Sequence, residues 1–399
     1  MKQINRLHFV TFIYMLSLLD YAQKKHNHFC KLAQQIHQEY PLSINQINYY
    51  STNYHSIPIK DILNLIKIQH KLIHKFPFSC KWLFTEKNAQ QASDYLIASY
   101  HGTLFKDYQI IADVCCGIGS DLLYLSKKAT KCYAIDINQE ILDYAKYNMK
   151  TFNKGNIEFL NIRAEDFNFY SDALFIDPDR RINNKRYIKP EDLSPNFFTI
   201  EKLISKYHNV AVKMSPAFDY ESSPYDKFSY DFVSVRGELK ECLLKSGSLA
   251  NCNNIKKAVL LPQRLMFEQK NHPETDIKQI KEWILEPDPS IIRAHLINDL
   301  AYELKMDRID PHIALLTSNN EPDEIFGKKY KVNNVFDYSL KKLNNYLKTI
   351  NIGTIDIKTK GFSESVESFR KKLKLKGNNK LQIFIVRVIN KHIVIEVVN

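Results

Sequence analysis

The chain contains little glycine and proline, with 10 glycines and 14 prolines among 399 residues. This scarcity argues against long disordered linkers, because unstructured segments are usually rich in one or both residues. Hydrophobic residues make up 44% of the chain and aromatic residues 12%, which is enough to form real hydrophobic cores. A chain of this length is expected to form two or three domains.

The seven cysteines form no recognisable pattern. Their number is odd and no two of them make a C-x-x-C pair, so neither a disulfide framework nor a cysteine zinc site is expected. Free cysteines are typical of a reducing compartment. We therefore expect a cytoplasmic protein without a bound metal.

Long hydrophobic runs are also missing. Residues 7–19 follow a basic start, as in a signal peptide, but polar side chains interrupt this run, Asp20 ends it and no small-x-small cleavage site follows. The run is also short for a membrane span. Because its apolar residues fit one helix face, we expect a packed helix there and no association with a membrane.

Two of the few glycines stand close together. Gly117 and Gly119 follow the apolar run 110–112 and precede a helix-like run at 122–127. Glycines at this spacing let the backbone turn sharply between a strand and a helix and bring amide groups close to a ligand. Position 122 is leucine, so the G-x-G-x-x-G dinucleotide fingerprint is incomplete, and no G-x-x-x-x-G-K-[ST] phosphate loop occurs. The pattern predicts a nucleoside site without a pyrophosphate.

Carboxylates follow the expected strands in order. Asp113 precedes the glycine turn, where it would repel a pyrophosphate and suit a cationic amino-acid group. Asp136 closes the second apolar segment, a position that suits the two hydroxyls of a ribose. Asp166 follows a third strand at 157–162 and could accept a hydrogen bond from an adenine, with the backbone amide of Ala164 beside it. A carboxylate after a strand is often only a helix cap, which is the alternative for Asp166.

The pattern D-x-x-x-G-x-G, formed by Asp113, Gly117 and Gly119, resembles the first motif of the class I S-adenosylmethionine-dependent methyltransferases. The resemblance implies S-adenosyl-L-methionine as the cofactor and a seven-stranded Rossmann-like sheet. It places the following residues at the cofactor: Gln91, Asp113, Cys115, Gly117, Gly119, Asp121, Asp136, Ile137, Ala164 and Asp166.

Six segments resemble the bacterial methyltransferases that carry a THUMP-like domain. In that family a ferredoxin-like insert precedes a C-terminal THUMP-like module, and THUMP modules are associated with RNA. The family commonly has alanine where this chain has Asp179. The resemblance implies an RNA acceptor, tRNA or rRNA. The segments are residues 91–93, 116–121, 177–181, 237–241, 286–289 and 370–377.

The fourth expected strand ends in Asp177, Pro178 and Asp179, followed by Arg180 and Arg181. Methyltransferases of this architecture hold the acceptor here, and those that methylate exocyclic amines have [DNS]-P-P-[YFW]. The missing aromatic weakens the case for a stacked, flipped base. The arginines favour an anionic acceptor or a nearby phosphate, although either could instead pair with Asp177 or Asp179. We expect Asp177, Pro178 and Arg180 to be catalytic, with Asp177 orienting the acceptor and receiving any proton.

Three more strands are expected in this domain, at 210–213, 230–235 and 258–261, with an amphipathic helix at 237–244. Lys213 ends the first of these strands and Ser215 follows it, and both residues could line the acceptor site. A polar cap on a buried strand end is the alternative for both residues.

The predicted fold is α/β with additional α+β modules. Helix-like stripes without a strand pattern cover the N-terminal part, where Thr85 or Ser93 is expected to cap a helix. Strands and helices then alternate, which predicts a doubly wound sheet. The expected regions are an N-terminal helical region at 1–105, a methyltransferase domain at 106–262, a ferredoxin-like segment at 263–325 and a basic THUMP-like domain at 326–399.

Positive charge is concentrated near the C-terminus. Residues 325–399 contain 16 lysines and arginines against 5 aspartates and glutamates, so they hold +11 of the chain's net charge of +12. Such a concentration is typical of nucleic-acid binding, although a solvated lysine-rich face is the alternative. The densest run gives the candidate RNA-binding residues Arg370, Lys371, Lys372, Lys374 and Lys376.

These observations favour an RNA methyltransferase. Two alternatives remain open at the level of the sequence. The protein could methylate a small molecule, with an incidental basic segment, or it could bind RNA through a methyltransferase fold that no longer performs chemistry.

Overall fold

The computed structural model describes residues 18–55, 57–179, 193–220, 228–250 and 255–398, together with the backbone of residues 181–182 and 185–186. The chain forms two compact units, residues 1–228 with 243–253 and residues 229–242 with 254–399. Most of the helix expected at 7–19 lies outside the described residues, but its last residues, Leu18 and Leu19, are helical and buried.

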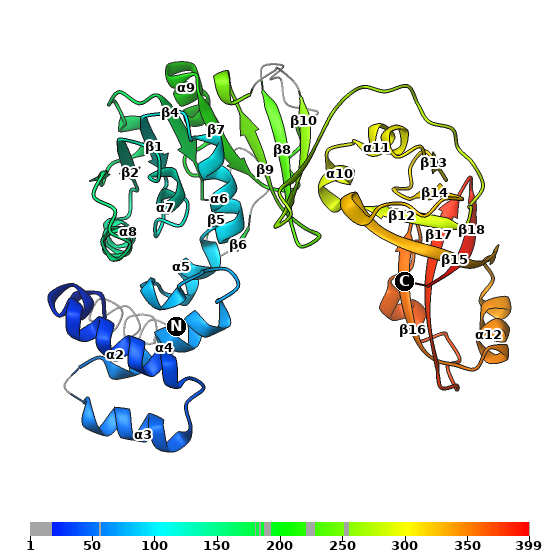
Figure 1. Ribbon diagram of the computed structural model, residues 1–399, viewed down its shortest axis with the longest axis horizontal. Coiled ribbons are helices and arrows are strands. Elements are labelled where there is room, and N and C mark those ends of the chain that lie inside the picture. The colour runs from blue at the N-terminus through cyan, green and yellow to red at the C-terminus, as the bar shows by residue number, and fades with distance from the viewer. Residues whose placement is uncertain are drawn as a thin grey trace. The chain divides into compact units, whose positions relative to one another are not determined.

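The described N-terminal part is helical, as the sequence predicts, and α2, α3 and α4 lie together (Figure 1). Thr85 caps α5, because its side chain accepts a hydrogen bond from the amide of Asn88. Ser93 is not a cap, and Asp94 caps α6 instead. The helices are α2 His26–Glu39, α3 Ile44–Asn53, α4 Ile59–Lys71, η1 Ser79–Lys81, α5 Glu86–Gln91 and α6 Tyr95–Leu104.

A parallel sheet forms the centre of the first unit, with the strand order β7-β4-β1-β2-β3. Its inner strands are nearly continuous apolar runs, as expected for strands that are covered on both faces. The elements are β1 Ile110–Val114, α7 Leu122–Leu125, β2 Lys131–Ile135, α8 Gln139–Thr151, β3 Ile157–Leu160, η2 Ala164–Asp166, β4 Ala173–Ile176, α9 Phe197–Tyr207 and β7 Val210–Met214.

Over the described residues the whole sheet has nine strands, so the expectation of seven was wrong. Its order is β11-β10-β8-β9-β7-β4-β1-β2-β3, and the sequence did not indicate β9 or β11. The added strand β11 pairs antiparallel with β10 at the edge. The remaining elements are β8 Ser229–Val235, β9 Glu238–Lys245, η4 Gly247–Leu249, β10 Lys256–Leu261 and β11 Leu265–Glu268.

The amphipathic helix expected at 237–244 was also wrong, because these residues form most of β9. Arg236 and Gly237, with φ of 53° and 77°, make a two-residue turn between β8 and β9. Positive φ at both positions is the geometry of a tight β-hairpin. Residues 241–245 are buried, and burial on both faces outweighs the helix propensity of leucine, lysine and glutamate.

A second sheet has seven strands in the order β13-β14-β12-β15-β18-β17-β16. β12 pairs antiparallel with β15, so this sheet contains strands from both sides of the boundary expected near 325, and the ferredoxin-like module expected at 263–325 is not confirmed. Ile284 and Leu315 share a hydrophobic cluster with Phe384 and Ile395, which explains why one core spans the expected boundary. The elements are β12 Trp283–Pro287, α10 Pro289–Arg293, α11 Ile297–Glu303, β13 Asp307–Arg308, β14 Leu316–Ser318, η5 Glu324–Phe326, β15 Gly327–Asp337, α12 Leu340–Thr349, β16 Ile352–Lys360, α13 Val366–Arg370, β17 Asn379–Val388 and β18 Lys391–Val398.

Candidate active site

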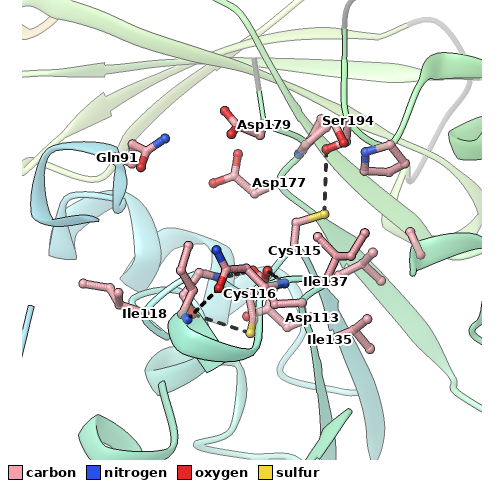
Figure 2. A pocket seen from close by; sticks show the side chains of 18 of the residues that line it. Gln91, Asp113, Cys115, Cys116, Ile118, Ile135, Ile137, Asp177, Asp179 and Ser194 are labelled. Atoms are coloured by element: carbon pink, nitrogen blue, oxygen red, sulfur yellow. Dashed lines mark hydrogen bonds between the residues drawn. The ribbon is translucent and has the colours of Figure 1, made fainter. Parts of the chain in front are cut away.

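A cavity of about 670 Å³ lies in the first unit and is lined by residues that follow β1, β2 and β4 (Figure 2). Ligands of doubly wound sheets bind at this edge, outside the carboxyl ends of the strands. Ten residues singled out in the sequence line it: Gln91, Asp113, Cys115, Gly117, Asp121, Asp136, Ile137, Ala164, Asp177 and Pro178.

The glycine turn has the geometry that its sequence predicts. Gly117 and Gly119 have φ of 54° and 89°, a region that side chains with a Cβ rarely adopt. A Cβ on Gly119 would lie 3.0 Å from the Cε atom of Met149, whereas a Cβ on Gly117 would meet nothing within 4 Å. Gly119 therefore serves the turn and its packing and does not line the cavity, while Gly117 leaves space for a ligand.

Asp136 is held at the end of β2 by two backbone amides. Its carboxylate accepts hydrogen bonds from Gly117, with an N···O distance of 3.2 Å, and from Asn138, at 2.9 Å. Burial raises the pKa of Asp136, and these amide bonds oppose the rise. The neighbouring Ile137 has a relative exposure of 64% and lines the cavity, so it offers an apolar surface to a flat ring.

Asp113, at the end of β1, is 1% exposed. Among the described residues, neither of its carboxylate oxygens has a hydrogen-bond partner. Burial raises the pKa of Asp113 well above its ordinary value, and repulsion from Asp121, Asp177 and Asp136 adds to the effect. A buried carboxyl group in such a place is stabilised by a positively charged ligand.

Asp121 differs from Asp113 because its partners are part of the chain. Ser93 Oγ donates a hydrogen bond to it at 2.6 Å, and His101 Nδ1 lies 2.7 Å from its other oxygen. Burial alone would raise the pKa of Asp121, but the bond to His101, helped by the charge of Lys213 and by Ser93, holds it below its ordinary value. Asp121 is therefore a fixed negative charge in the wall.

Asp177 forms an ion pair with Lys213, whose Nζ atom lies 2.7 Å from the Asp177 Oδ2 atom. Ile176 of β4 pairs with Val212 of β7, so the next residue of each strand reaches the same edge of the sheet. The sequence named Lys213 only as a residue that could line the site or cap a strand. The sequence contained one signal for this ion pair, because it placed a lysine and an aspartate at the ends of two expected strands.

Pro178 is buried, and Asp179 beyond it is exposed. Asp179 and Ser194 exchange backbone hydrogen bonds of 2.9 and 3.0 Å, which brings residues 193–196 to the cavity. Figure 2 shows Asp177 and Asp179 on the same side of the pocket. The predicted catalytic residue Arg180 lies outside the described residues, and of Arg181 only the backbone, in the two-residue strand β5 Arg181–Ile182, is described.

The segment expected to contact an adenine forms η2. Ala164 is buried and lines the cavity, as does Glu165, whose carboxylate accepts a hydrogen bond from Arg163 Nε at 2.5 Å. Asp166 is exposed and is not among the lining residues. The sequence does not indicate that Glu165 and not Asp166 lines the cavity, because only the orientation of the short helix distinguishes these two adjacent carboxylates.

These residues fit S-adenosyl-L-methionine. That cofactor carries a sulfonium and an ammonium group, and five aspartates line the cavity: Asp113, Asp121, Asp136, Asp177 and Asp179. The carboxyl group of Asp113, which has no hydrogen-bond partner among the described residues, and the open space beside Gly117 would suit a cationic nucleoside. In the part of the chain that the structure describes, no cluster of three or more histidine, cysteine, aspartate or glutamate side chains could hold a metal ion.

The five basic residues expected to bind RNA are all exposed in the second unit. Leu373 and Leu375 pack against a hydrophobic cluster, so the lysines that alternate with them face solvent. Asn344 of α12 fixes this segment by donating to the carbonyl of Lys372 and accepting from the amide of Lys374. The five residues are Arg370, Lys371, Lys372, Lys374 and Lys376, of which Lys372 also pairs with Glu364 at 2.7 Å.

Helix α12 extends this positive surface. Lys341 and Lys348 are exposed and stand three residues before and four residues after Asn344. Residues at this spacing share one face of a helix, here the face that contacts the lysine-rich segment. We call the surface formed by Lys341, Lys348 and the five basic residues at 370–376 the basic surface. No helix within the described ranges is both long and apolar enough to cross a bilayer.

Comparison with known proteins identifies two regions of the chain. A methyltransferase-domain model matches residues 111–176, and a THUMP domain-like model matches residues 327–397. The chain is 26% identical over 314 residues to an uncharacterized S-adenosylmethionine-dependent methyltransferase of Mycobacterium tuberculosis, which covers 77% of this chain and 85% of that protein. It is 31% identical over 113 residues to an uncharacterized RNA methyltransferase of Oceanobacillus iheyensis, 27% of this chain and 24% of that protein.

A solved structure of a methyltransferase from Porphyromonas gingivalis W83 has the same fold, with a TM-score of 0.75 and 17% identity over 94% of this chain and 98% of that one. The chain is therefore a class I S-adenosylmethionine-dependent methyltransferase. Within that class it belongs with the members that carry a THUMP-like domain, and the expected cofactor, S-adenosyl-L-methionine, is confirmed.

Proposed function

We propose that this protein transfers the methyl group of S-adenosylmethionine to a nucleotide of structured RNA, tRNA or rRNA. The observation that carries the proposal is that one chain holds both a pocket walled by carboxylates and the exposed basic surface. The first suits a cationic methyl donor, and the second suits a polyanion.

The cofactor's position follows from the charges in the pocket. We place its ribose at Asp136, its adenine between Ile137 and the Ala164–Glu165 backbone, and its cationic groups near Asp113 and Asp121. The sulfonium is an activated donor when bound, so the chain's own task is to align the acceptor and exclude water. Asp177 lies at the strand end where the acceptor is expected and provides an oxygen that accepts a hydrogen bond.

The RNA partner is supported by charge. A surface with seven exposed lysine and arginine side chains attracts phosphates without selecting a sequence. The relative from Oceanobacillus iheyensis is named an RNA methyltransferase, which agrees with this assignment. Structured RNA of this kind is found in the cytoplasm, and we propose that location.

The deciding experiment supplies the purified protein with tritiated S-adenosylmethionine and total RNA from a strain that lacks the gene. We expect tritium in one RNA size class, and nucleoside mass spectrometry then names the modified atom. RNA from the parent strain is the matched control, because its sites are already methylated and should accept little label.

The two alternatives give different results in the same assay. A small-molecule methyltransferase would label a metabolite extract and leave RNA unlabelled. A protein that only binds RNA would retain RNA on a filter but transfer no label, whether or not it binds the cofactor. Transfer of label to RNA at the same rate by a variant lacking both Asp113 and Asp136 carboxylates would contradict the assigned pocket.

A further inference from the structure

Lys213 is a cation that stands among the aspartates of the pocket. Its Nζ atom donates to Asp177 Oδ2 at 2.7 Å and to Ser93 Oγ at 2.8 Å. The Lys213 side chain is 8% exposed and the Asp177 side chain 22%, so water screens their attraction only weakly. Two fixed oxygens therefore hold the ammonium group in place.

This contact continues into the wall of the pocket. Ser93 Oγ donates to Asp121, and Asp121 in turn contacts His101 of α6. Five side chains thus form one connected series, in the order Asp177, Lys213, Ser93, Asp121 and His101. Because each member is fixed by the next, Asp177 is oriented by the fold and not by the acceptor.

Acidic groups lie close to Asp177. Asp113 and Cys115, from β1 and its turn, Asp179 beyond β4 and Lys213 from β7 are described neighbours of this carboxylate. All of these except Lys213 are acidic. Carboxylates that share a site favour binding a proton, whereas an ammonium in contact favours the ionised form.

We propose that Lys213 is a positioning residue that holds Asp177 ionised and fixed, so that Asp177 orients a neutral N–H acceptor by accepting its hydrogen bond. This proposal rests on the methyl transfer proposed above and names the acceptor class. The acceptor nitrogen uses its lone pair to bond the methyl carbon, and the carbon–sulfur bond breaks with its electron pair left on sulfur. The nitrogen is then cationic and loses its proton to water, so no proton has to be removed before attack.

The first test needs no acceptor. Protein labelled with 13C at the aspartate carboxyl carbon is titrated by NMR, and the signal of Asp177 is identified by its loss in Asp177→Asn. We expect the titration midpoint of Asp177 to rise by about one pH unit or more in Lys213→Met. Lys213→Arg keeps a cation and should restore the wild-type midpoint. Ser93→Ala removes a second hydrogen-bond partner of Lys213 and should leave the midpoint of Asp177 close to that of the wild type.

The second test follows transfer to total RNA against pH. We expect the wild-type rate to be flat between about pH 6 and about pH 8, and the Lys213→Met rate to be lower by about twofold or more at the acid end and to rise with pH as Asp177 ionises. Lys213→Arg should recover the flat profile. S-adenosylmethionine binding, measured by calorimetry, confirms that each variant is folded, and Lys213→Gln replaces the methionine variant if that one fails to bind.

The two tests separate the two proposals. If the wild-type protein transfers nothing to RNA, the proposed function fails, and the NMR titration still decides the role of Lys213. An unchanged midpoint of Asp177 in both neutral variants would overturn the role of Lys213. So would a uniform loss of rate with no change in the pH profile, because a merely structural residue produces that result.

Discussion

His101 Nδ1 lies 2.7 Å from Asp121 Oδ1, and the two side chains are 0% and 7% exposed. Removing the imidazole leaves a buried carboxylate with fewer partners, so His101→Ala should lower the free energy of unfolding by about 3–5 kcal/mol. Urea denaturation of the cofactor-free protein measures this change. The double variant with Asp121→Asn should recover part of the loss, and strict additivity of the two substitutions would contradict a direct interaction.

Asp113 should stabilise the complex with the cofactor and lower the folding stability of the cofactor-free protein. The pKa of Asp113 is raised in the folded protein. Asp113 therefore contributes to folding stability at pH values below the pKa that it has in the unfolded chain. This contribution is lost as the pH rises through its pKa in the folded protein. Asp113→Asn does not titrate, so the variant should be more stable than the wild type at about pH 8 and less distinguishable from it at about pH 5. Thermal unfolding at the two pH values checks the sign, and a variant that is less stable at both values would refute it.

The same carboxyl group should link cofactor binding to protons. A bound cation lowers the pKa that burial raises, so S-adenosylmethionine should release a proton from Asp113 on binding. Affinity then increases with pH up to the pKa of the free protein, by at most about tenfold per pH unit for one proton. Calorimetry in two buffers with different ionisation heats counts the protons, and Asp113→Asn should release none from this site.

Gly119 should tolerate no side chain. Alanine at φ of 89° is strained, and its Cβ would lie 3.0 Å from the Met149 Cε atom. We expect Gly119→Ala to cost about 1–3 kcal/mol of unfolding free energy and to weaken cofactor binding. Gly155→Ala is the matched control, because a Cβ there meets nothing within 4 Å. Equal behaviour of the two variants would argue against the turn geometry.

The basic surface should account for the salt dependence of RNA binding. β15 pairs with β12, so deleting residues 325–399 would leave an incomplete sheet, and point substitutions are the better test. Changing Lys371, Lys374 and Lys376 to glutamine should weaken RNA binding and reduce the salt slope by up to about one for each phosphate that is no longer neutralised. The cofactor affinity should not change.

The control for that prediction removes the same charge elsewhere. Lys31, Lys60 and Lys67 are exposed on the N-terminal helices, and changing them to glutamine also removes three positive charges. If both triple variants reduce the salt slope equally, binding follows net charge and the basic surface has no special role.

The parallel strands and their acidic ends could be predicted from the sequence, because each strand is a short apolar run that stops at a polar residue. β9 could not, since its leucine, lysine and glutamate residues also suit a helix and only the Arg236–Gly237 turn reveals the hairpin. The continuity of the second sheet across the boundary expected near 325 could not be predicted for a different reason. Pairing between β12 and β15 joins residues far apart in the chain, and local composition contains no information about such a pairing.

In the site, the identity of the carboxylates could be predicted but their partners could not. Asp121 was expected to contact the cofactor, and the structure shows that it also belongs to a series with Ser93 and His101. Lys213 stands 36 residues after Asp177, and only the register of β4 against β7 brings them together.

The acidic groups that crowd around the glycine turn should favour release of the used cofactor. Methyl transfer converts a sulfonium into an uncharged thioether, so the bound molecule becomes less positive while its surroundings do not change. Spent cofactor is then attracted less than fresh cofactor and departs more readily. This weaker attraction predicts a larger dissociation constant for S-adenosylhomocysteine than for S-adenosylmethionine.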